Sequence, residues 1–154
     1  MRAADLLVLY DYYYWATGKV LTQAERVTPE QWAGPSPLGE RSLQALLVHT
    51  LNAERQWRHG WAGRERPAPL QAADFPDAAS LGACWREEEA AMRAYLAALS
   101  DDDARSSAAF GHPLWQVIAH VSYHGMQHRS EAAMLLTHLG HSPGDIDMVF
   151  WLEA

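Results

Sequence analysis

Cysteine is nearly absent from this chain of 154 residues, in which Cys84 is the only one. A disulfide within the chain is therefore excluded, and so is the stapled framework of small secreted proteins. A domain of about this length buries roughly 70% of the surface that its unfolded chain exposes, so it needs no covalent staple. A single cysteine is also typical of a reducing compartment, and we expect the protein to be cytoplasmic.

Long apolar runs are lacking as well. No stretch of about 18 uncharged apolar residues occurs, so the sequence predicts no membrane-spanning helix. The first residues include Asp5 and Asp11 and contain no small-residue cleavage site, so we expect no signal peptide.

Positive charge is scarce. The chain has 12 basic and 19 acidic residues, a formal net charge of -7, and no run of five Lys or Arg. Proteins that bind phosphate backbones are usually basic, so we expect no nucleic-acid partner.

Apolar residues recur at spacings of three and four in four segments, which predicts four amphipathic helices. We expect them over residues 3–25, 42–59, 77–99 with Asp77 as the cap, and 113–140. The segments between them are rich in proline, glycine, serine and aspartate, and no strand pattern or internal repeat is evident. The pattern therefore predicts an all-α fold, a four-helix bundle with a C-terminal tail, in one domain over residues 1–154.

Histidine is abundant, with eight in the chain and six between residues 112 and 141. His120, His124 and His128 are four residues apart on the last predicted helix, each step turning about 40° around its axis. A helical projection places His128 near the middle of the apolar stripe, His124 at its shoulder and His120 further out. Two imidazoles at i and i+4 can bind one metal ion, which makes His124 and His128 the expected pair.

A third ligand should come from another helix, because two histidines leave a metal site incomplete. His49 is the best candidate, at the shoulder of the second apolar stripe. His59 lies near a helix end and is expected to be exposed, while His120 is expected to support a ligand rather than bind metal. A lone histidine beside a core is usually only a structural residue, so the prediction depends on the pair. We predict one divalent ion (zinc, nickel or iron) bound by His49, His124 and His128.

Three motifs stand out in combination. The longest is His-Val-Ser-Tyr-His-Gly-Met-Gln-His-Arg at 120–129, which is followed by Leu-Gly-His-Ser-Pro and Asp-Ile-Asp. The other two are His49 with Ala53-Glu54, and Tyr14-Trp15-Ala16. Together they resemble the DinB-like (DinB/YfiT) superfamily of metal-binding helical bundles, over nearly the whole chain. The resemblance implies three metal-ligating histidines at His49, His124 and His128, in agreement with the projection. Thr17, Ser130 and Glu131 depart from the usual family residues, which limits any transfer of substrate but not of metal binding.

Two kinds of function stay open. The resemblance implies an enzyme acting on a small molecule, either a metal-dependent hydrolase or an S-transferase that uses a low-molecular-weight thiol. The alternative is a non-catalytic metal-binding protein of the stress or DNA-damage response. No catalytic residue is identified; Glu54 and Glu131 are candidate general bases only through proximity to the ligands. For Arg129 we expect a salt bridge to a neighbouring helix rather than contact with a substrate anion. An open cleft beside the ion would favour the enzyme.

The first predicted helix has a second apolar face. Val8, Tyr12 and Trp15 recur at i, i+4 and i+7, opposite the stripe that faces the core. A helix with two apolar faces must bury both or expose a patch. We expect either a homodimer through this face or packing by Phe150 and Trp151 of the tail.

Overall fold

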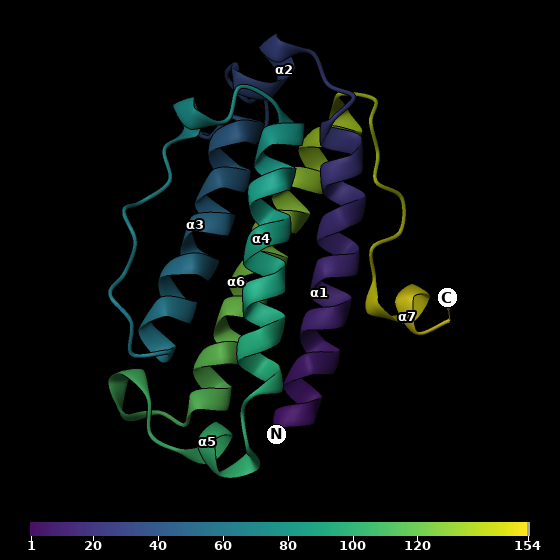
Figure 1. Cartoon of the computed structure of the whole chain (residues 1–154). Coiled ribbons are helices and arrows are strands. Elements are labelled where there is room, and N and C mark those ends of the chain that lie inside the picture. Colours follow the sequence, from purple (N-terminus) through teal and green to yellow (C-terminus); the bar gives the residue numbers. More distant parts are fainter. Residues whose placement is uncertain (154) are drawn as a thin grey trace.

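The computed structural model describes residues 1–153, apart from the side chain of Ala109, and places four long helices side by side (Figure 1). These are α1 (Ala3–Ala24), α3 (Leu43–Trp61), α4 (Ala78–Ala97) and α6 (Leu114–His138). Shorter elements complete the described chain: α2 (Pro29–Ala33), the 3-10 turn η1 (Ala72–Asp74), α5 (Asp101–Arg105), the 3-10 turn η2 (Ala109–Gly111) and α7 (Met148–Leu152). Over these residues no strand forms, so the predicted all-α four-helix bundle is confirmed, with boundaries within two residues of those expected.

Side-chain caps fix where the helices begin. Ser42 accepts a hydrogen bond from the Ala45 amide at 3.1 Å, and Asp77 accepts one from the Ser80 amide at 2.8 Å, as the sequence predicts for Asp77. Thr28 and Ser100 lie between the predicted helices, and each is the N-cap of a short helix that the sequence did not predict. Capping boxes hold both of these helices, because the third helical residue bonds back to the cap.

The segment between α3 and α4 runs back along the outside of α3, so these two helices are parallel (Figure 1). Three side chains of α3 tie it down, with His59 against the Glu65 carbonyl, Gln56 against the Pro67 carbonyl and Asn52 against the Leu70 amide. Each helix packs against two others: α1 and α3 both contact α4 on one side and α6 on the other. The α3–α6 seam is thereby formed by the two helices that carry the predicted metal ligands.

The core is built from the apolar stripes that the sequence predicts. On α1 the buried residues include a set at spacings of three and four, namely Leu6, Tyr10, Tyr13, Thr17, Val20 and Ala24. One ion pair also lies in the core: Arg58 on α3 donates to Glu88 on α4, with Nε–Oε1 at 2.5 Å and Nη2–Oε2 at 2.7 Å. This bidentate pair explains why the Glu88 carboxylate is buried on α4.

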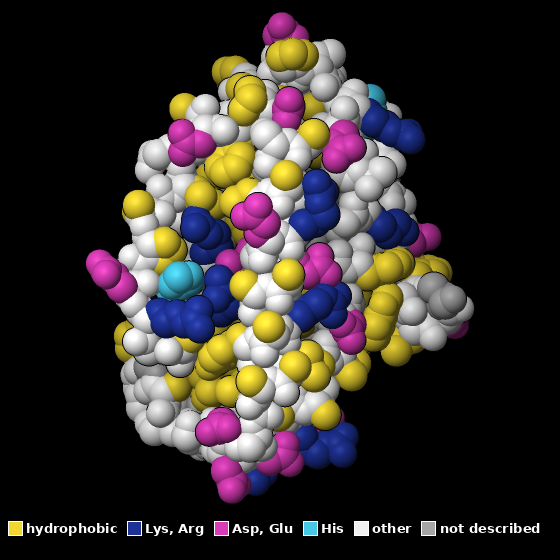
Figure 2. All heavy atoms as spheres, viewed as in Figure 1, with side chains coloured by type: hydrophobic (Ala, Val, Ile, Leu, Met, Phe, Trp, Pro, Cys, Tyr) yellow, Lys and Arg dark blue, Asp and Glu magenta, His cyan; other side chains and the backbone are white. Residues whose placement is uncertain are grey.

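The C-terminal tail covers part of the second apolar face of α1 (Figure 1). Tyr12 donates a hydrogen bond to the Ile146 carbonyl at 2.9 Å, and its ring lies 6.1 Å from that of Trp151 between centroids. Hydrophobic side chains still gather on the surface where α7 adjoins α1, and Val8 stays 46% exposed (Figure 2). The tail thus covers Tyr12 through Ile146 and Trp151, whereas Phe150 stays 46% exposed. Self-association through the uncovered part of this face stays a prediction. None of the helices in the described part of the chain is both long and apolar enough to cross a membrane.

Candidate metal centre

The structure brings the three predicted ligands together at the α3–α6 seam. His49 extends from α3, and His124 and His128 extend from successive turns of α6. One nitrogen of each ring lies within 4.8 Å of a nitrogen of both others, so the group could hold a metal ion. Ring centroids are 4.5 Å apart for His124 and His128, 4.9 Å for His49 and His128, and 5.3 Å for His49 and His124.

Hydrogen bonds orient the His128 ring for coordination. Its Nδ1 lies 2.9 Å from the Glu131 carboxylate, one turn further along α6, and its Nε2 lies 3.1 Å from Nε2 of His124. A carboxylate only accepts, so Nδ1 carries the proton and the Nε2 lone pair of His128 faces the triad. A carboxylate behind a histidine fixes ligand rings in many metal sites. Glu131 therefore supports His128 rather than standing free.

The site favours neutral imidazoles. Burial, followed by the neighbouring charges of His128 and His49, lowers the pKa of His124 to about 4. Burial and then the positive charge of Arg41 lower the pKa of His49. The hydrogen bond from His128 lowers the pKa of Glu131, which keeps that carboxylate ionised. Neutral imidazole is the form that binds metal, so His49 and His124 need lose no proton at neutral pH.

These donors suit a small divalent cation. Zinc bound to imidazole has metal–nitrogen bonds of about 2.0–2.1 Å, which places tetrahedral ligand nitrogens about 3.3 Å apart. The His124–His128 pair, at 3.1 Å, already meets this spacing. His49 needs only a small rotation, since its ligand atom is within 4.8 Å of the others.

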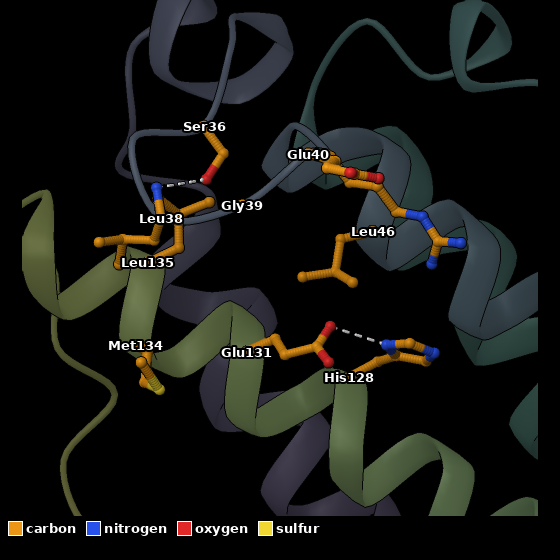
Figure 3. A pocket seen from close by; sticks show the side chains of 10 residues that line it. Ser36, Leu38, Gly39, Glu40, Leu46, His128, Glu131, Met134 and Leu135 are labelled. Atoms are coloured by element: carbon orange, nitrogen blue, oxygen red, sulfur yellow. Dashed lines mark hydrogen bonds and ion pairs between the residues drawn. The ribbon is translucent and has the colours of Figure 1, made fainter.

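An open cavity of about 430 Å³ lies directly beside the triad. Figure 3 shows its floor and roof: His128 and Glu131 lie below, the loop residues Ser36 and Leu38 lie above, and Leu46 points between them. The remaining lining residues are Gly39, Glu40 and Arg41 from the loop and Met134 and Leu135 from α6. The cavity is of a size that small-molecule sites use, and His128 of the triad lines it.

His120 and His59 also lie on the helices of the triad. His120 is exposed, and its ring lies 5.9 Å from that of Trp57 and 6.4 Å from that of His124 between centroids. The carboxylate that supports His128 comes from Glu131, and the expected supporting role of His120 stays a prediction. His59 is half-buried rather than exposed, since its Nδ1 lies 2.9 Å from the Glu65 carbonyl.

Glu54 is held in the core and does not line the cavity. Its carboxyl group accepts hydrogen bonds from the hydroxyls of Tyr13, at 3.1 Å, and Tyr14. Burial is the largest cause that raises its pKa, to about 8. Of the two candidate bases, Glu54 is therefore enclosed and Glu131 is engaged by His128, so neither is a free base at the cavity.

Arg129 faces α1 instead of an acidic partner. Its Nη1 donates to the Tyr13 carbonyl and its Nη2 to the Tyr12 hydroxyl, both at 3.3 Å, and the guanidinium lies over both rings. The expected salt bridge is wrong, because the helix that Arg129 meets presents aromatic rings and carbonyls there. The Arg129 side chain is buried and does not line the cavity.

Gly125, between the two predicted ligands of α6, allows α1 to approach closely. A Cβ atom at this position would lie 2.3 Å from Cε2 of Tyr13 and 2.7 Å from its hydroxyl. A glycine inside a helical ladder of histidines is the sequence signal for such an approach. The helix that carries His124 and His128 is thus seated against α1 by a contact that tolerates no side chain.

The model of the DinB family matches residues 1–154, the whole of the chain. None of the curated proteins matches it.

Proposed function

The chain belongs to the DinB family, and from this premise we propose that it is a metal-dependent enzyme acting on a small molecule. The observation that carries the proposal is an open cavity beside three histidines that could hold a metal ion. Structural metal sites are closed by a fourth protein ligand, whereas catalytic ones keep a position free. The reaction class that fits is hydrolysis or S-transfer with a low-molecular-weight thiol.

A bound zinc, nickel or iron ion would supply Lewis acidity and an exchangeable position for water, a substrate oxygen or a thiolate. The residues of the chain prepare that position. Glu131 holds the His128 ring in one tautomer, and burial keeps His124 neutral. Leu46, Met134 and Leu135 give the cavity an apolar wall, which lowers the local dielectric and strengthens electrostatic interactions near the triad.

We propose that the protein acts in the cytoplasm, where low-molecular-weight thiols are reduced. The single cysteine and the lack of a long apolar run favour this compartment. The acidic net charge of -7 disfavours nucleic acid as a partner.

One observation favours the second candidate function, a non-catalytic metal-binding protein of the stress response. Neither Glu54 nor Glu131 is a free general base at the cavity.

An S-transferase tolerates the lack of a free general base better than a hydrolase does, because a thiolate needs less help from a base than water does.

The test compares metal-loaded with metal-stripped protein on ester, amide and thiol-conjugate substrates. We expect turnover in the loaded form alone. Equal rates in both forms would refute a catalytic metal, and no turnover in either form would place the stress-response candidate first.

A further inference from the structure

Arg41 stands at the mouth of the cavity. It lies in the loop just before Ser42, the cap of α3, and lines the same cavity as His128 and Glu131. Its side chain is exposed, and within residues 1–153 its guanidinium takes part in no ion pair. The charge is close enough to the triad to act on the pKa of His49 and of Glu131. A guanidinium with its donors free beside a metal centre is equipped to bind an anion.

The other charges of the cavity limit which anion fits. Glu131 is already engaged by His128, and Glu40, next to Arg41 in the loop, adds a second carboxylate to the lining. The group bound by Arg41 also lies near Glu40, so a carboxylate with one negative charge meets less repulsion there than a phosphate with two. A planar carboxylate also matches the fork of a guanidinium.

The walls define the rest of the ligand. Leu38, Leu46 and Leu135 add an apolar surface to the lining, and Figure 3 shows Leu46 between the loop and His128. The cavity of about 430 Å³ has room for a short chain between the two polar ends.

We propose that Arg41 binds a carboxylate of the substrate, whose opposite end reaches the metal centre at His128 across an apolar wall. The inference deepens the proposed function and rests on it. It assigns the substrate class as small carboxylates that carry a metal-binding group, such as a thiol, a few bonds away.

Cobalt-loaded protein allows a direct test by binding rather than turnover. Mercaptopropionate and mercaptoethanol are similar thiols that differ in a carboxylate, and each reports its binding through a thiolate-to-cobalt absorption band. A charge-assisted hydrogen bond contributes about 1.5–3 kcal/mol, so wild type should bind mercaptopropionate roughly 10- to 100-fold more tightly. Arg41→Gln should lose this preference and keep its affinity for mercaptoethanol, and Arg41→Lys should retain part of it.

The matched control is Arg64→Gln. Arg64 is also exposed but follows the opposite end of α3, about 28 Å away along a helix of 19 residues. It should leave both affinities unchanged. Equal affinity of wild type for the two thiols, or a preference that survives Arg41→Gln, would overturn the role of Arg41 alone. If neither thiol produced a band, the open metal position itself would be refuted, and the inference with it.

Discussion

Gly125→Ala should weaken the fold at the metal centre. The added methyl group would lie 2.3 Å from the Tyr13 ring, which is buried and bonded to Glu54 and so has little room to move. Overpacking costs about 1–3 kcal/mol, and so close a contact should cost about 3. Alanine recovers about 1 kcal/mol through its higher helix propensity. We expect a net loss of about 2 kcal/mol in the free energy of unfolding, measured by urea denaturation of metal-free protein.

The same substitution at Gly18 of α1 is the control, because a Cβ there meets nothing within 4 Å. Gly18→Ala should stabilise the protein by about 1 kcal/mol through helix propensity. The two variants should therefore move the urea midpoint in opposite directions. If Gly125→Ala also stabilised the protein, the close packing of α1 against the ligand helix would be disproved.

Three further predictions concern charged groups. Glu131→Gln should weaken metal binding roughly 10- to 100-fold in chelator competition, because a neutral amide oxygen accepts from His128 more weakly than the carboxylate does. The metal-free protein should lose stability as pH falls from 6.5 to about 4, because the pKa of His124 is lower in the folded protein and the unfolded chain therefore takes up the proton first. The His124→Asn variant should lose less stability over the same pH range. Arg58→Ala should lower the free energy of unfolding by about 3–5 kcal/mol, because it leaves Glu88 buried and unpaired.

Each of these has its own control. Glu87→Gln changes an exposed carboxylate of α4 and should leave metal affinity unchanged. A pH slope identical in wild type and His124→Asn would show that His124 does not titrate below its usual range. The double variant Arg58→Met with Glu88→Leu should recover much of the stability lost in Arg58→Ala, and failure to do so would point to packing rather than an unpaired charge.

Local sequence patterns were sufficient to predict the four long helices and the meeting of three histidines. The period of three to four sets which face of a helix is buried, and it places His124 and His128 on one side of α6. His49 could be predicted because two histidines on α6 leave a metal site incomplete, and α3 carries a histidine beside its own apolar stripe. The cap at Asp77 and the stop at Gly140, which has a φ of 85°, follow from equally local chemistry.

Partners across the fold could not be predicted in the same way. Arg41 and Leu38 reach the cavity because the loop before α3 folds over the end of α6, and no periodicity encodes that path. Arg129 meets aromatic rings instead of a carboxylate because the rotation of α1 about its axis turns Tyr12 and Tyr13 toward α6. Glu54 lies near His49 in sequence, yet the turn of the helix carries it into the core.

The central claim is that His49, His124 and His128 bind one divalent ion together. Elemental analysis of protein purified without a histidine tag, loaded with zinc or nickel and then desalted, measures this directly. We predict about one equivalent of metal per chain in wild type and in His138→Ala, whose exposed histidine ends α6. Alanine at any one of the three ligand positions should abolish stoichiometric metal, and full occupancy in His128→Ala would contradict the claim.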